Sequence, residues 1–78
     1  MTKTELRDLF YQKMLVEAVV EPSLTSGGWI VEFRHARGGL VPLTDGQGVE
    51  QCFQDVDIAT ENALDIGFHQ VRIVDNDM

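Results

Sequence analysis

The sequence predicts a single small α+β domain spanning residues 1–78, because a chain of 78 residues has room for one hydrophobic core. Apolar residues recur at helical spacing near the N-terminus and again after residue 55. Residues 29–35 instead alternate apolar and polar side chains, as a half-buried strand does. We therefore expect an N-terminal helix, an antiparallel sheet of three to five strands, a second helix packed on the sheet, and a C-terminal strand.

The first helix is expected over residues 3–16. Thr2 and Glu5 have the spacing of a capping box, in which each side chain accepts from the backbone N–H of the other residue. Leu6, Phe10 and Met14 then recur four residues apart, with Leu9 and Leu15 alongside. This spacing gives the helix one apolar face for the core.

The helical spacing decays over residues 17–21, where β-branched residues accumulate before Pro22. A short strand and a longer helix are both consistent with this segment. After a Ser- and Gly-rich loop, residues 29–35 form the clearest strand of the sequence. Its expected core-facing side chains are Trp29, Val31 and Phe33.

Two turns organise the middle of the chain. Residues 36–39 end in two glycines, which supply the positive φ of a hairpin turn, and residues 40–44 form the returning strand. Pro42 has no N–H to donate, so this strand is expected at a sheet edge. Residues 45–48 form a second turn, which leads to a short strand over 49–53.

The second helix is expected to begin after Asp55, an N-cap residue, and to end at Gly67. Its apolar positions, three and four residues apart, face the core: Val56, Ala59, Ala63 and Ile66. Phe68 should pack back on the last turn. A closing strand follows over 69–74, and residues 75–78 should fray.

The net charge of −7 lies in the second half of the chain. Residues 1–44 carry five acids and five bases, whereas residues 45–78 carry eight acids and one base. An acidic surface repels phosphate and attracts bases. We therefore expect a protein partner with a basic surface, and nucleic acid is an unlikely ligand.

The candidate partner-binding residues lie on the second helix. Asp57, Glu61 and Asp65 fall four residues apart, so their carboxylates form one stripe, which we call the acidic stripe. Like charges at this spacing cost about 0.2–0.5 kcal/mol per pair, which invites a functional interpretation. Ile58 and Leu64 flank the stripe and could contact a partner or a second copy in a homodimer. A solvated helix face that keeps the protein soluble is the alternative.

The sequence predicts no enzyme, metal site or cofactor. His35, His69 and Cys52 are possible ligands or catalytic groups, but their spacing matches no zinc pattern. A thiolate nucleophile would also need a base within hydrogen-bonding reach, and the sequence places neither histidine beside the cysteine.

A nucleic-acid interface is the alternative function. Three antiparallel strands followed by a helix resemble the small DNA-reading sheets of integrase arm-binding domains, and Arg34, Arg37 and Arg72 lie on or near the expected sheet. Those domains carry many more bases, because phosphate neutralisation supplies most of their affinity. Arg34 and Arg72 are expected on the second face of the sheet, paired with Glu32 and Glu50.

Three parts of the chain together resemble small, poorly characterised proteins of bacterial plasmids and integrated mobile elements, some labelled partition-associated. They are residues 5–11, the strand pair 29–33 with 41–45, and residues 57–67 with Val71. The resemblance implies a bacterial mobile-element setting and covers most of the chain. No site residue carries over from it.

The composition predicts a cytoplasmic protein. Cys52 is the single cysteine of the sequence, whereas small secreted domains usually carry several. No apolar run approaches the roughly 18–20 residues that span a bilayer, and the N-terminus lacks the apolar stretch of a signal peptide.

Overall fold

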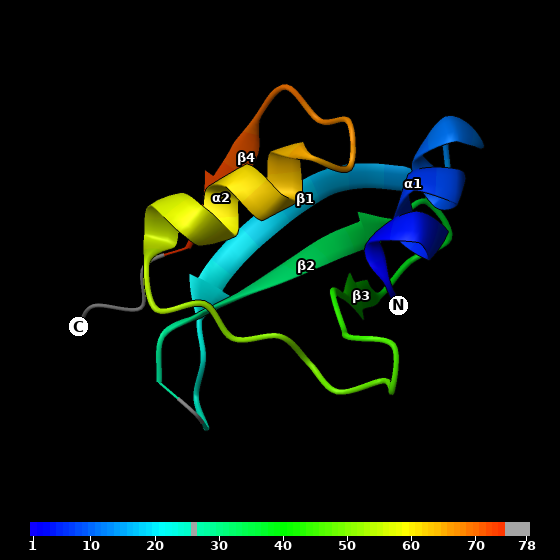
Figure 1. Cartoon of the computed structure of the whole chain (residues 1–78). Helices are drawn as coiled ribbons and strands as arrows, with labels where there is room; N and C mark the ends of the chain where they lie inside the picture. The colour runs from blue at the N-terminus through cyan, green and yellow to red at the C-terminus, as the bar shows by residue number, and fades with distance from the viewer. Residues whose placement is uncertain (26, 75–78) are drawn as a thin grey trace.

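The computed structural model describes residues 1–25 and 27–74, and it confirms the α+β class (Figure 1). The elements of these residues are, in chain order, α1 (Lys3–Tyr11), β1 (Leu15–Pro22), β2 (Trp29–His35), β3 (Leu40–Pro42), α2 (Val56–Leu64) and β4 (Val71–Ile73). The strands form one sheet in the order β3-β2-β1-β4. Because β4 runs parallel to β1, the sheet is mixed and not purely antiparallel as expected.

The capping box at the start of α1 is confirmed: the Glu5 N–H donates to Thr2 Oγ1 at 3.3 Å, and the Thr2 N–H donates to Glu5 Oε1 at 3.0 Å. The predicted extension of this helix to residue 16 is wrong. Lys13 adopts the left-handed conformation, with φ of 62°. The N–H of Met14 then returns to a carbonyl of the last helical turn at 2.9 Å. This Schellman geometry ends the helix and lets the chain turn into β1.

Residues 17–21 belong to β1, so they form a strand and not an extension of the first helix. Its register against β2 shifts between Leu15 and Glu17, so Val16 is the extra residue of a β-bulge. Beyond the bulge the side chains alternate. Ala18 and Val20 are fully buried in the core, whereas glutamates at 17 and 21 lie on the opposite face of the sheet.

The hairpin between β2 and β3 confirms the predicted turn at 36–39, and Pro42 lies on an edge strand as expected. The predicted strand over 49–53 does not form. This segment makes two isolated bridges, one between Glu50 and Thr44 and one between Phe53 and Trp29. The turn before it is held by the carboxylate of Asp45, and the chain then crosses from β3 to the far end of β2 without a continuous ladder.

α2 begins at the predicted N-cap, where the Asp57 N–H donates to Asp55 Oδ1 at 2.9 Å. It ends before Gly67, whose φ of 137° is unfavourable for other residues. The ring of Phe68, which was expected to pack on the last turn of α2, lies edge-on to Phe10 of α1 at 4.8 Å and is stacked on Phe33 of β2 at 5.8 Å. These rings join α1, the sheet and the end of α2.

The core lies between the helices and one face of the sheet (Figure 1). Its largest fully buried side chains include Phe33, Val31 and Leu6, whereas Trp29 is half-buried at the margin. The second face of the sheet is covered by no helix within the described residues, and we call it the uncovered face. The predicted fraying of residues 75–78 lies outside the described residues.

The expected last strand over 69–74 is shorter than predicted and is confined to β4. Its three residues pair with the middle of β1, and the Val74 N–H adds a hydrogen bond to the Val20 carbonyl at 2.8 Å. Neither helix of the described chain has the length and apolarity to cross a membrane.

The close approach of Gly28 to Phe53 predicts a large cost for adding one methyl group. Both Gly27 and Gly28 have positive φ, at 72° and 75°, but only at Gly28 would a Cβ collide with the Phe53 carbonyl oxygen. That oxygen accepts from the Trp29 N–H at 2.6 Å. We expect Gly27→Ala to destabilise the fold by about 1 kcal/mol and Gly28→Ala by about 3 kcal/mol in urea unfolding followed by Trp fluorescence. Equal costs would contradict this packing.

Candidate functional site

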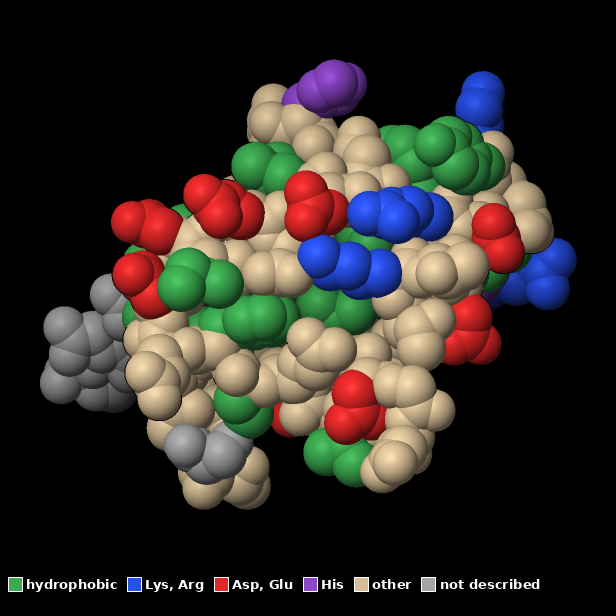
Figure 2. Space-filling view, in the orientation of Figure 1, with side chains coloured by type: hydrophobic (Ala, Val, Ile, Leu, Met, Phe, Trp, Pro, Cys, Tyr) green, Lys and Arg blue, Asp and Glu red, His purple; other side chains and the backbone are tan. Residues whose placement is uncertain are grey.

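The acidic stripe lies on the outer face of α2, as the sequence predicted. Asp57, Glu61 and Asp65 are all exposed, while the opposite side of the helix buries Ala59 and Ala63. Figure 2 shows the acidic side chains gathered over α2. Nothing covers this face within the described residues, so its carboxylates are accessible to a partner.

The C-terminal end of the stripe is neutralised from within the chain. Lys3 Nζ lies 3.0 Å from Asp65 Oδ2, and Arg7 Nε donates to the Asp65 carbonyl oxygen at 3.0 Å. Basic groups of α1 therefore compensate both the carboxylate and the negative end of the α2 macrodipole. Among the described residues, no ion pair reaches Asp57 or Glu61.

Ile58 and Leu64 are both partly exposed, at 48% and 38% of their surface. With about 100° between successive residues of a helix, they fall on opposite sides of the stripe and are separated by Glu61. They therefore form two apolar margins of an acidic surface and not one continuous apolar patch.

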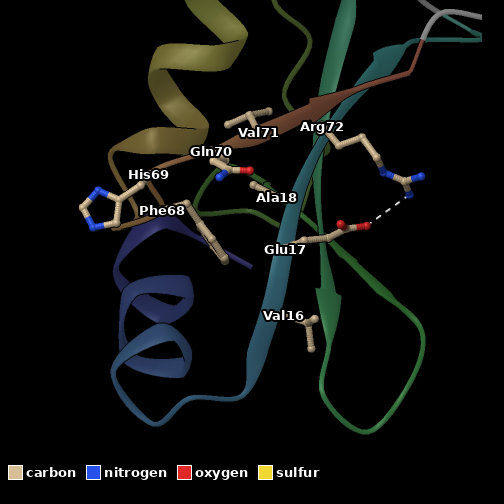
Figure 3. A pocket seen from close by; sticks show the side chains of 8 residues that line it. All are labelled: Val16, Glu17, Ala18, Phe68, His69, Gln70, Val71 and Arg72. Carbon is tan, nitrogen blue, oxygen red and sulfur yellow. Dashed lines mark ion pairs between the residues drawn. The ribbon is translucent and has the colours of Figure 1, made fainter.

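The uncovered face carries the arginines of the alternative interface. Arg72 Nη2 lies 3.1 Å from Glu17 Oε1, as Figure 3 shows, and Arg34 Nε lies 3.8 Å from the same oxygen. Both arginines are on the expected face, but their partner is Glu17 and not Glu32 or Glu50. The shared carboxylate reduces the positive charge that a phosphate would meet.

The third arginine of the alternative interface, Arg37, is exposed in the β2–β3 turn, where its backbone N–H donates to His35 Nδ1 at 3.1 Å. It lies outside the pair of arginines that Glu17 holds on the sheet. The structure therefore does not bring the three arginines together into one continuous basic surface.

The opposite end of the uncovered face holds three glutamates, which sequence analysis did not assign to a common site. Glu21 of β1 and Glu32 of β2 lie within hydrogen-bonding reach of each other. Their hydrogen bond, the burial of Glu32, and the charges of Glu21 and Glu50 raise the pKa of Glu32 to about 7. The period-two alternation of both strands was a signal that Glu21 and Glu32 share a face, but their proximity depends on the strand register.

A cavity of about 580 Å³ opens beside the start of β4, where the chain diverges from β1 (Figure 3). Its polar lining residues are Glu17, Arg72, Gln70 and His69. Glu17 and Arg72 pair with each other, which leaves Gln70 and His69 as the other polar lining residues. The described lining contains no serine, threonine, cysteine or lysine.

The remaining candidate ligands do not converge. Cys52 is exposed and lies beside Ser23, with 3.8 Å between sulfur and oxygen. It lines a second cavity, of about 390 Å³, whose described lining contains no histidine. Within residues 1–25 and 27–74, no three His, Cys, Asp or Glu side chains are placed to hold a metal ion.

Comparison with known proteins found no matching family model, curated protein or solved structure. The resemblance to mobile-element proteins therefore stays a prediction. The charged groups of the described residues form three surfaces: free carboxylates on α2, an arginine pair that shares one carboxylate on the sheet, and a carboxyl cluster beside it.

The contact between Arg7 and the end of α2 predicts a measurable contribution to stability. We expect Arg7→Ala to lower the free energy of unfolding by about 0.5–1 kcal/mol, because it removes the hydrogen bond to the Asp65 carbonyl. Arg37→Ala removes the same charge from an exposed turn and should change it by less than about 0.3 kcal/mol. Urea unfolding of both variants measures the difference, and an equal effect would mean that the contact contributes nothing.

Proposed function

We propose that this chain is a non-enzymatic interaction domain that binds a basic surface of a protein partner through the outer face of α2. The observation that carries the proposal is the contrast within the acidic stripe. Asp65 is neutralised by Lys3, whereas Asp57 and Glu61 are exposed and reached by no ion pair of the described chain. A partner's lysine or arginine would supply the missing counter-charge.

Electrostatics and apolar contact support the same surface. Asp57 and Glu61 repel each other by about 0.2–0.5 kcal/mol, and a base placed between them would remove that cost. Ile58 lies at the margin of the stripe and is 48% exposed, so a partner that contacts the carboxylates can also bury apolar surface there. Charge attraction would set the association rate and specificity, and apolar burial would slow dissociation.

A neutral variant tests this surface without breaking the fold. Asp57→Asn/Glu61→Gln removes two negative charges and keeps side-chain size, and Asp65 stays unchanged because it pairs with Lys3. Asp8→Lys is the matched control, since it changes the net charge equally at an exposed position of α1. Each immobilised form is exposed to bacterial lysate at about 50 and 300 mM salt, and captured proteins are identified by mass spectrometry.

The proposal expects a protein that wild type and the Asp8→Lys control both capture at the lower salt, and that the Asp57→Asn/Glu61→Gln variant loses. The captured protein, once purified, should bind wild type at least about tenfold more tightly than the double variant in calorimetric titration. Capture by all three forms, or by none, would refute binding through the acidic stripe.

A structural homo-oligomer is the alternative that one observation favours. β4 is an edge strand of the described sheet, and its Ile73 is 51% exposed, so a second copy could extend the sheet there. This alternative requires a solution mass that rises with concentration and falls after Ile73→Lys. Light scattering at about 10 and 500 µM tests it, and a monomer mass at both concentrations would exclude it.

A further inference from the structure

The uncovered face brings two carboxyl groups together across neighbouring strands. The register pairs Val19 with Glu32 and Glu21 with Ile30, so Glu21 and Glu32 are diagonal neighbours on one face. Their side chains lie within hydrogen-bonding reach of each other. The segment after β3 adds Glu50, which is bridged to Thr44 and contributes charge at the same place.

One oxygen of this cluster lacks a hydrogen-bond donor within the part of the chain that the structure describes. Glu32 Oε1 is buried and receives no hydrogen bond from any N–H or O–H group of the described residues. A buried acceptor without a partner costs about 1–3 kcal/mol, and more when it is charged. Two ionised carboxylates at this separation would also repel each other. A proton held between Glu21 and Glu32 removes both costs.

Among residues 1–25 and 27–74, no ion pair offsets the negative charge at this end of the face. Glu21 faces Glu32 from β1, and Glu50 faces it from the segment after β3. The nearest base on the same strand is Arg34, two residues away on the same face, and its ion pair is with Glu17. The same carboxylate also holds the arginine of β4. The two arginines carried by strands of the sheet, Arg34 and Arg72, are thus engaged at its other end.

We propose that Glu21 and Glu32 form a proton-binding site, in which the two carboxyl groups share one proton across the uncovered face and release it to solvent as the pH rises. The deprotonated site holds two carboxylates beside Glu50. The carboxylates of Glu21, Glu32 and Glu50 then repel one another. We expect this repulsion to weaken the contact between β2 and the segment that carries Glu50, so that release of the proton destabilises the fold there.

The direction of the pH dependence follows from the two states. An unfolded glutamate titrates near 4.5, whereas the folded pair raises the pKa of Glu32 to about 7. Between these values the folded state binds more protons, so this contribution to stability is complete below about pH 4.5 and lost above about pH 7. The shift of the Glu32 pKa from 4.5 to about 7 corresponds to a change of about 300-fold in the unfolding equilibrium constant. Because water screens the charges at this partly exposed site, we expect a change of about tenfold.

Carbon-13 NMR of the glutamate carboxyl groups tests the site in the unmodified protein. We expect one carboxyl of the pair to titrate with a midpoint near pH 7, because the two carboxyl groups share one proton. Carboxyl carbons are observed so that titration of His35 and His69 does not interfere. If every glutamate titrates below about pH 5.5, the proposal is wrong.

Isosteric variants test whether the proton matters for stability. Glu32→Gln imitates the protonated group, because its amide can donate to Glu21. This variant should unfold like wild type near pH 5 and be about tenfold more stable than wild type near pH 8. Glu61→Gln, which removes one exposed charge from α2, should show no such difference between the two pH values. An effect of Glu32→Gln that is equal at pH 5 and pH 8 would assign the residue a packing role and overturn the proton site.

The contribution of Glu50 can be measured separately. Glu50→Gln removes one of the charges that favour the protonated pair, so the midpoint near pH 7 should move to lower pH. An unchanged midpoint would show that Glu50 does not act on the pair and would remove the proposed weakening of its junction with β2.

Discussion

The alternation of side chains along β1 is the constraint on which the rest of the structure depends. β1 pairs with a strand on each side, antiparallel with β2 and parallel with β4. Its residues Ala18 and Val20 are fully buried on the helix side, beneath α2. Ala59 and Ala63 are the fully buried residues of α2, and their side chains are small, so the helix can lie close to the strand. A shift of one residue in β1 would turn glutamates into this narrow interface.

The same alternation explains why the charged clusters of the sheet lie on its other face. Glu17 and Glu21 leave β1 on the side opposite the core, at the two ends of the strand's central segment. Glu17 meets two arginines from neighbouring strands, whereas Glu21 meets Glu32. One glutamate is therefore neutralised by bases and the other by a shared proton. The difference is set by strand register and not by any property of the glutamates themselves.

Local signals predicted much of the fold. Asp55 caps the start of α2, and Gly67 has a positive φ just after its end. Both effects involve only neighbouring residues of the chain, so the sequence alone predicts them. The end of α1 was missed because Lys13, a residue without special preference for the left-handed region, adopts it there. The parallel direction of β4 was missed because it depends on how α2 returns the chain across the sheet, which is a non-local property.

The candidate site was likewise predicted only in part. Helical spacing placed Asp57, Glu61 and Asp65 on one exposed face, but it could not show that α1 brings Lys3 to Asp65, because that contact joins opposite ends of the chain. The expected pairing of Arg34 failed for a related reason: its neighbour across the sheet is Glu17, and this depends on the bulge at Val16. Contacts within one element were predictable, whereas contacts between elements required the register.

The net charge of −7 is thus distributed over surfaces with different physical behaviour. The carboxylates on the outer face of α2 are exposed, so binding of bases there should weaken as the salt concentration rises. The proton proposed for the Glu21–Glu32 pair should respond to pH instead, because the pKa of Glu32 is raised to about 7. A partner bound by α2 and a proton bound by the sheet therefore respond to different variables, and salt and pH can separate the two proposals in a single protein.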